Sequence, residues 1–214
     1  MKITLTENQK LYFTSDTHYH HSNICRGVSK WDNRKNQTRD FNTLDEMNEV
    51  IVKNINNTVN PNDILVHLGD WSFGGFEKIE EFRNKIFCKN IFLIFGNHDT
   101  HIKNNKENIQ NIFSGCFDYL DLEIITQTTQ FTKKSKFICF HFPIASWDGL
   151  SKGVIHLHGH VHLPKELRLS AGKSMDVGVD GNNLYPISLN EVLDIMHTQP
   201  LQKLTLPKDH HENI

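Results

Sequence analysis

The sequence has no long apolar run and no block of basic residues. A membrane-spanning helix needs about 20 consecutive apolar residues, and no run of that length is present. The 23 basic residues are balanced by 25 acidic ones, for a formal net charge of −2. No strongly basic surface for wrapping duplex DNA is therefore predicted. Because Met1 to Leu5 lacks an apolar signal core, we expect a cytoplasmic protein.

The four cysteines do not form a Cys-x-x-Cys pair, and no internal repeat, low-complexity tract or linker is present. Isolated cysteines are typical of reduced, mostly buried thiols rather than of a disulfide framework. The length of 214 residues suits one α/β domain with a sizeable core. We therefore predict a single domain over residues 1–214, in which residues 197–214, polar and without periodicity, form an extended or mobile tail.

Several short apolar runs each end at a polar cluster. The runs cover residues 11–13, 64–68, 91–95, 137–140 and 154–157. They are rich in β-branched and aromatic residues and nearly continuous, which indicates strands buried on both faces. Ligands in open α/β sheets bind beyond the carboxyl ends of the strands. The polar clusters are therefore predicted to meet at one edge of a sheet.

Helices are predicted between these strands. Apolar side chains recur at helical spacing over 41–55, 76–86 and 188–196. Two of these segments begin with a capping-box pattern, Thr43-x-x-Glu46 and Ser188-x-x-Glu191. Residues 120–140 contain two strand-like stretches around a polar Gln/Thr turn, which predicts a hairpin.

The polar clusters supply seven oxygen and nitrogen donors. They are Asp16, His18, Asp70, Asn97, His141, His160 and His162. A carboxylate has two oxygens and can bridge two cations, whereas one imidazole nitrogen cannot. Such donors without thiolate suit Mn²⁺, Fe, Ni²⁺ or Zn²⁺. The pattern predicts a pocket for two metal ions, and two metal ions indicate phosphoester chemistry.

The order of these motifs also carries a resemblance. Asp-x-His, Gly-Asp, Gly-Asn-His-Asp, a later His and Gly-His-x-His resemble the calcineurin-like metallophosphoesterase superfamily from residue 16 to residue 162. Residues 13–24, together with His-Leu-Gly-Asp at 67–70 and Asp-Val-Gly-Val-Asp at 176–180, resemble a small bacterial and phage branch of phosphoesterases. That branch usually has glycine where His20 stands and an Arg-Pro pair near Lys30 and Trp31.

The resemblance implies a fold and a set of ligands. The fold class is α/β (α+β), a four-layer αββα sandwich of two mixed β-sheets flanked by helices. Two divalent metal ions are implied, with Mn²⁺ favoured and Fe, Ni²⁺ or Zn²⁺ as alternatives. The first ion would be held by Asp16, His18, Asp70 and His162. The second would be held by Asp70, Asn97, His141 and His160, with Asp70 bridging.

The same resemblance suggests a mechanism. Two cations about 3.5–4 Å apart convert water to hydroxide near neutral pH and stabilise charge on the phosphate. His98 lies between the ligand position Asn97 and Asp99, and is expected to protonate the leaving oxygen as general acid. Asp99 is expected to accept the other ring proton of His98 and raise its pKa.

The expected partner is a small phosphoester, either a phosphodiester or a nucleotide-like molecule, and no membrane. A nuclease of single-stranded or damaged nucleic acid is a second hypothesis, disfavoured by the net charge and the absence of an added DNA-binding module. A catalytically silent scaffold is a third, although such a protein would be expected to have lost donors. The substrate, the source and the oligomeric state stay open. Three polar loop residues could reach a substrate phosphate, although such residues are more often only solvated: Asn23, Arg26 and Lys30. Four aromatic residues beside the motifs could stack on a base, although covering the core is the commoner use of such side chains: Trp31, Trp71, Phe73 and Trp147.

Overall fold

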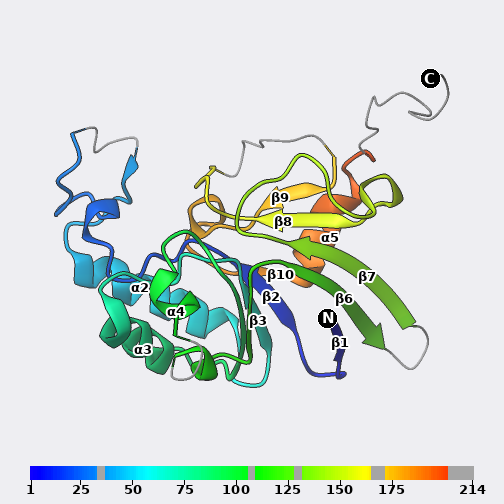
Figure 1. The fold of residues 1–214 in the computed structure, drawn as a ribbon, viewed down its shortest axis with the longest axis horizontal. Helices are drawn as coiled ribbons and strands as arrows, with labels where there is room; N and C mark the ends of the chain where they lie inside the picture. The colour runs from blue at the N-terminus through cyan, green and yellow to red at the C-terminus, as the bar shows by residue number, and fades with distance from the viewer. Residues whose placement is uncertain (33–36, 106–108, 128–131, 165–171, 202–214) are drawn as a thin grey trace.

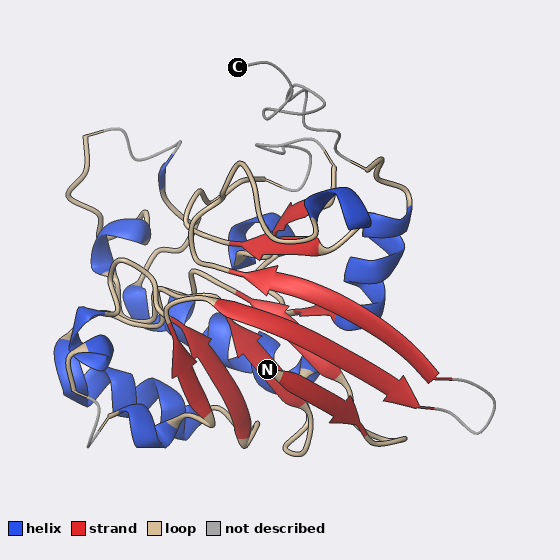
Figure 2. Cartoon of the chain, turned by 45° about the vertical axis from the view of Figure 1, so that its right-hand side comes forward, coloured by secondary structure: helices blue, strands red, loops and turns tan. Residues whose placement is uncertain are grey.

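The structure, a computed structural model, describes residues 1–32, 37–105, 109–127, 132–164 and 172–201 (Figure 1). Two mixed five-stranded β-sheets face each other, and helices flank them. This confirms the predicted sandwich of two sheets. Figure 2 shows the long hairpin of one sheet in front of the shorter strands of the other.

One sheet has the strand order β10-β2-β3-β4-β5. Its strands are β2 (Leu11–Thr14), β3 (Ile64–His67), β4 (Asn90–Ile94), β5 (Gly115–Phe117) and β10 (Ile187–Ser188). The first four are parallel, and β10 runs antiparallel to β2. The predicted runs at 11–13, 64–68 and 91–95 are therefore central strands, with their carboxyl ends at a common edge.

The second sheet has the order β1-β6-β7-β8-β9. Its strands are β1 (Lys2–Leu5), β6 (Leu120–Gln127), β7 (Thr132–Cys139), β8 (Ile155–His158) and β9 (Ser174–Asp176). The antiparallel pair β6 and β7 is the predicted hairpin, in register from Leu120 opposite Cys139 to Gln127 opposite Thr132. Its turn at 128–131 lies outside the described residues. β7, β8 and β9 are parallel.

The side chains of the central strands point alternately to the two faces of the sheet, and this divides the core into two clusters. Leu11 and Phe13 of β2 face the cluster between the sheets, where Phe13 lies 5.4 Å from Phe137 of β7 between ring centroids. Tyr12 points to the opposite face, where it joins a cluster beneath the helices. Successive side chains of a strand point to opposite faces, so a run that is apolar at every position becomes a strand buried on both sides, as predicted.

The helices are α2 (Leu44–Thr58), α3 (Gly75–Lys85), α4 (Thr100–Lys103) and α5 (Leu189–His197), with short 3-10 helices η1 (Ser22–Ile24), η2 (Gln110–Ile112), η3 (Leu150–Lys152) and η4 (Val179–Asn182). α2, α3 and α4 cover the outer face of the β2 sheet through side chains such as Ile51, Phe82 and Ile102. α5 adds Val192 and Met196 to the cluster between the sheets.

Both predicted helix caps are present. The Thr43 side chain accepts a hydrogen bond from the Glu46 amide at the start of α2. Ser188 and Glu191 form a reciprocal capping box at the start of α5. Each cap contributes about 1 kcal/mol to helix stability, and each one fixes where a helix leaves the sheet.

All four cysteines are free, and three of them are buried. Among the described residues, no helix combines the length and apolarity that crossing a bilayer requires. α5 includes His197, which was expected to begin the tail, and residues 202–214 lie outside the described residues.

Candidate metal centre

The loops that carry the predicted donors extend the strand pairing beyond the strand ends. The Asp16 amide donates to the Gly69 carbonyl at 2.9 Å, and the His18 amide donates to the Asp70 carbonyl at 3.0 Å. Ser15, just after β2, also pairs with Gly178, just after β9, so the two sheets are joined at this edge. The loops are thereby hydrogen-bonded to one another rather than free to diverge.

Backbone strain is concentrated in these loops. Eight described non-glycine residues have positive φ, and five of them are predicted donors. They are Asp16, His18, Asp70, His160 and His162, with φ between 48° and 72°. A side chain in this region costs about 1–3 kcal/mol and persists where the surroundings enforce it. This conformation turns each donor inward from a loop that would otherwise continue as a strand.

Two glycines allow the backbone to approach the donors closely. A Cβ atom on Gly159 would lie 2.0 Å from Ser15 Oγ and 2.3 Å from Asp16 Oδ2. A Cβ atom on Gly96 would lie 2.2 Å from Asp70 Oδ1. The space that a methyl group would take is instead occupied by the two central carboxylates. The Gly-His and Gly-Asn pairs of the motifs therefore have a steric origin.

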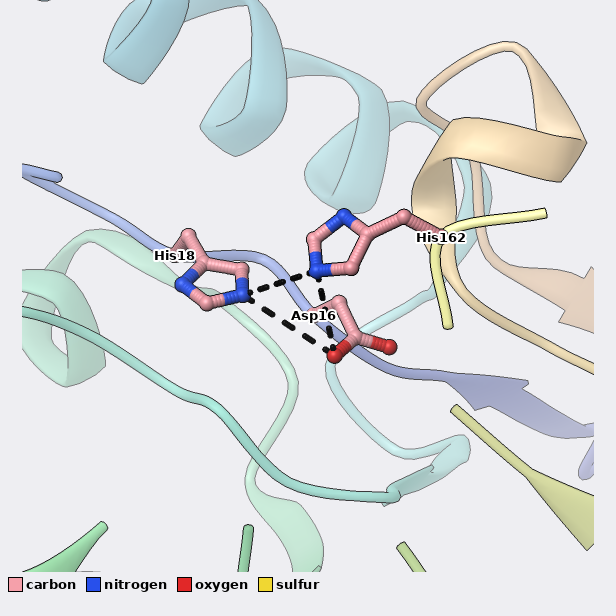
Figure 3. Close-up of side chains that lie close together, drawn as sticks. All are labelled: Asp16, His18 and His162. Carbon is pink, nitrogen blue, oxygen red and sulfur yellow. Dashed lines mark hydrogen bonds and ion pairs between the residues drawn. The ribbon is translucent and has the colours of Figure 1, made fainter. Parts of the chain in front are cut away.

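Asp16, His18 and His162 converge on one point (Figure 3). His18 Nε2 lies 3.1 Å from His162 Nε2 and 3.9 Å from Asp16 Oδ1. His162 Nε2 lies 3.7 Å from the same oxygen. Asp16 is fully buried and His18 is nearly so, whereas His162 borders solvent. These three side chains form a group that could hold a metal ion.

Asp70 lies between this group and the remaining donors. Its Oδ2 atom is 3.5 Å from His18 Nε2 and also 3.5 Å from His141 Nε2. Asp16, Asp70 and His141 form a second group with the spacing of metal ligands. The central position of Asp70 between two histidines is the arrangement expected of a bridging carboxylate.

Asn97 and His160 complete the cluster. Asn97 Oδ1 lies 3.0 Å from His141 Nε2 and 3.0 Å from His160 Nδ1. Asn97 is exposed and His160 is partly exposed, so this end of the cluster faces solvent. The structure thus brings all seven predicted donors together.

The outer nitrogens of two histidines show which inner nitrogen has a lone pair. His141 Nδ1 lies 2.7 Å from the Leu68 carbonyl, which can only accept, so Nδ1 carries the hydrogen. His162 Nδ1 likewise faces Asp180 Oδ2 at 2.6 Å. In the neutral rings, Nε2 therefore has a lone pair directed at carboxylate or amide oxygens. Facing acceptors need a proton or a metal cation between them, and this set of nitrogen and oxygen lone pairs fits bound metal ions.

The pKa shifts in the cluster also favour bound cations. Burial raises the pKa of Asp16 to about 7, because its carboxylate has lost its hydration. Burial opposes ionisation of Asp70 too, but His141, His18 and the His98 amide outweigh it and lower the pKa of Asp70. Burial also disfavours the charged form of His141, yet Asp70 and Asp16 raise its pKa to about 8. The carboxylates thus attract positive charge, which divalent cations would provide.

Asp180 and Arg39 hold the donor His162 and the Asp16 loop in place. Sequence reasoning did not assign either residue to the site. Asp180 accepts from His162 and forms a bidentate pair with Arg39, at 2.8 Å from Nε and 2.9 Å from Nη2. Arg39 is buried and also donates to the Thr17 carbonyl at 2.8 Å and the Asp16 carbonyl at 2.6 Å. Asp180 ends the Asp-Val-Gly-Val-Asp stretch at 176–180, and that motif was the available signal.

His98 and Asp99 are adjacent in sequence but have different environments. His98 is exposed beside the cluster, its ring 4.7 Å from Phe73 and 5.5 Å from His18 between centroids. Its backbone amide donates to Asp70 Oδ1 at 2.9 Å. The ring therefore borders the site and is not one of the seven donors.

Asp99 does not make the expected pairing with His98, since no hydrogen bond between the two side chains occurs in the described structure. The Asp99 carboxylate is buried and accepts three backbone amides, those of Asp70, Trp71 and Gly96, at 2.8, 2.9 and 2.8 Å. Both oxygens are thereby committed to the backbone. Asp99 instead holds the Asp70 loop against the Gly96 turn.

His21 lies behind His18. Its Nδ1 atom is 3.3 Å from His18 Nδ1, and its ring stacks on Phe73 with centroids 3.6 Å apart and planes at 13°. Burial lowers the pKa of His21 to about 4, so the ring is neutral near pH 7. A neutral ring can accept the Nδ1 hydrogen of His18. The lone pair of His18 is then on Nε2, which faces the cluster and could bind a metal ion.

A family model described as calcineurin-like phosphoesterase matches residues 9–176. The chain belongs to the calcineurin-like phosphoesterase family. The match spans all seven donors, from Asp16 to His162, together with the strands that position them. Membership implies a hydrolase, and the grouped Asp and His side chains agree with the use of metal ions.

The chain is also similar to one further protein in sequence and to another in fold. The chain is 28% identical over 193 residues to the uncharacterized protein MJ1445 of Methanocaldococcus jannaschii, covering 88% of this chain and 92% of that protein. The crystal structure of the protein of unknown function AQ665 from Aquifex aeolicus matches 88% of this chain and 100% of its own, with a TM-score of 0.60 and 24% identity. That likeness supports the fold.

Proposed function

We propose that this calcineurin-like protein is a metal-dependent phosphohydrolase that cleaves a small phosphoester, a phosphodiester or a nucleotide-like molecule. The observation that carries the proposal is the convergence of seven donors, two of which are buried carboxylates. Family membership supports hydrolysis of a phosphoester. We further propose two divalent cations, with Mn²⁺ favoured and Fe, Ni²⁺ or Zn²⁺ as alternatives.

The geometry supports a division of the donors into two sets. Asp16, His18 and His162 would hold one ion, and Asn97, His141 and His160 would hold the other. Asp70 would contribute to both, because its Oδ2 atom is equally distant from His18 and His141. When bound, such ions lower the pKa of water and stabilise negative charge on a phosphate.

The remaining chemical task is to protonate the leaving oxygen, and we propose His98 for it. Its imidazole is exposed at the rim of the cluster, and its backbone amide is anchored to Asp70 Oδ1. A ring beside the donors can reach a group that departs from a phosphate bound there. We therefore propose that the His98 ring donates its proton to the departing alkoxide.

A nuclease and a non-catalytic scaffold are the other hypotheses raised by the sequence. The net charge of −2 favours a small substrate over a long polyanion. A scaffold does not need five strained donors in one cluster, and strained residues of this kind are concentrated at active and ligand-binding sites. Hydrolysis of a small phosphoester is therefore the function that these observations support best.

The test is hydrolysis of p-nitrophenyl phosphate and bis-p-nitrophenyl phosphate by metal-stripped protein, with Mn²⁺, Ni²⁺, Zn²⁺ or Mg²⁺ added back singly. We expect metal-restored activity that is abolished in Asp70→Asn. Asp194→Asn, an exposed carboxylate on α5, is the control and should behave as wild type. Absence of both activity and bound metal in the wild-type protein would overturn the proposal. The ratio of diester to monoester activity would distinguish the two substrate types.

A further inference from the structure

A cleft of about 850 Å³ opens directly beside the metal-donor cluster. His162 is shared by both, because its ring lines the cleft and its Nε2 atom faces Asp16. Asp180 and Arg39, which hold His162, form part of the wall. Pockets of roughly 300–1,000 Å³ are typical of small-molecule sites. A group attached to a phosphate at the cluster therefore has space to extend into this cleft.

Trp31 is the distinctive side chain of the cleft. It is 36% exposed, whereas Trp71 and Trp147, the other two tryptophans of the chain, are 0% and 7% exposed. Its backbone amide donates to Ser29 Oγ at 3.2 Å, which helps to fix the loop. A large aromatic ring left partly open beside a candidate active site is the kind of surface on which planar ligands stack.

Aromatic rings connect Trp31 with the donor cluster. The Trp31 ring meets the His21 ring edge to face, with centroids 6.0 Å apart and planes at 88°. His21 stacks on Phe73, which in turn lies beside His98. Successive ring contacts thus link the cleft to the proposed general acid. A ligand that spans this distance meets aromatic side chains at one end and metal donors at the other.

The other lining residues suit a flat ring with a polar edge. Ile24 and Val161 provide apolar surface, and Lys30 and Gln37 provide hydrogen-bonding groups. An aliphatic chain would make no use of these polar groups, and a sugar offers Trp31 an aliphatic C–H face rather than a π face. A nucleobase has both features, a π face and an edge of donors and acceptors.

We propose that this cleft binds the nucleobase of a nucleoside phosphoester, with the base stacked on Trp31 and the phosphorus at the donor cluster. This inference rests on the proposed function and names its substrate class. Trp31 is then a specificity-determining residue that discriminates nucleoside esters from small esters. It takes no part in the chemical step.

The test compares two substrates that share a leaving group, the p-nitrophenyl ester of thymidine 5′-monophosphate and methyl p-nitrophenyl phosphate. We expect Trp31→Ala to lower the ratio of kcat/KM for the nucleoside ester to that for the methyl ester by about 10-fold, the loss of one stacking contact. Trp31→Phe should keep most of the ratio. Phe87→Ala removes an aromatic side chain that is 63% exposed but does not line the cleft, and should leave the ratio unchanged.

A binding measurement separates this inference from the proposed function. Adenosine and thymidine 5′-monophosphates should quench the tryptophan fluorescence of the wild-type protein, and Trp31→Phe should abolish the quenching because the remaining tryptophans are buried. If neither ester is hydrolysed with any metal ion, the proposed function fails. The quenching then tests by itself whether the cleft binds a nucleobase. An unchanged ratio in Trp31→Ala, or no quenching of the wild-type protein, would overturn the inference.

Discussion

Asp180 Oδ2 lies 2.6 Å from Nδ1 of His162, on the opposite side of the ring from the nitrogen that faces Asp16. The carboxylate fixes the hydrogen on Nδ1 and leaves the Nε2 lone pair directed into the cluster. Arg39 holds the same carboxylate through two hydrogen bonds, and its positive charge helps to lower the pKa of Asp180 despite burial. The candidate metal centre therefore depends on residues that provide none of the seven donors.

Asp180→Asn is expected to weaken metal binding. The amide cannot hold the protonated Nδ1 as a carboxylate does, and it leaves the buried Arg39 without its counter-charge. Loss of such an outer partner typically lowers metal affinity by about 10–100-fold. The affinity is to be measured by isothermal titration calorimetry with Mn²⁺, using Asp194→Asn as the control. An affinity equal to that of the wild type would show that the pair has no role in orienting His162.

His98→Ala is expected to lower turnover while two metal ions stay bound. General acid catalysis contributes about 10²–10⁴-fold, and the loss should be greater for an alkyl leaving group than for p-nitrophenolate, which needs little protonation. His101→Ala, an exposed histidine on α4, is the matched control. Equal losses for the two leaving groups, or loss of the metal ions, would argue against the general-acid role.

Gly159→Ala is expected to damage the site through sterics alone. Its Cβ would clash with Ser15 Oγ and displace the Asp16 carboxylate, at a cost of about 1–3 kcal/mol in the free energy of unfolding. Gly75→Ala is an informative control. Apart from its chain neighbours and the backbone of its own helix, nothing described lies within 4 Å of its Cβ position, whereas its φ of +74° would strain the alanine. Urea unfolding and metal titration of both variants would separate the effects. Only Gly159→Ala should also lose metal affinity, and unimpaired metal binding in that variant would contradict the prediction.

His156 is expected to make stability depend on pH. Its Nδ1 atom donates to the Ile138 carbonyl at 3.1 Å, and its Nε2 atom accepts from the Ile144 amide at 3.3 Å. Burial lowers the pKa of this ring to about 4. The unfolded chain therefore binds a proton that the folded protein does not, so stability is present above about pH 6.5 and falls as the pH drops toward 4.

The measurement is urea unfolding of the wild type and His156→Gln at pH 7.5 and pH 5. Glutamine can replace both hydrogen bonds but does not titrate. The wild type should lose on the order of 2 kcal/mol more than the variant between these pH values. Comparable losses in the two proteins would show that other groups cause the acid sensitivity.

The central strands, the hairpin, three of the helices and the convergence of seven candidate donors could be predicted from the sequence because their signals are local. Apolar runs at 11–13 and 64–68 become strands whatever their partners are, and Ser188 caps its helix with a residue three positions away. The donors were identifiable because each follows a strand, and the carboxyl ends of parallel strands meet at one edge. Motif order then related them to a family that the comparisons confirm.

Only the tertiary structure determined which side chains support the site. Asp99 was expected to serve His98 because the two are neighbours in sequence, but successive residues in a tight turn point in different directions, and its carboxylate caps the amides of Asp70, Trp71 and Gly96. Arg39 and Asp180, which are 141 residues apart in the chain, meet because the two sheets face each other. Sequence spacing determines local geometry, whereas ion pairs and stacked rings across sheets depend on the fold that brings distant residues together.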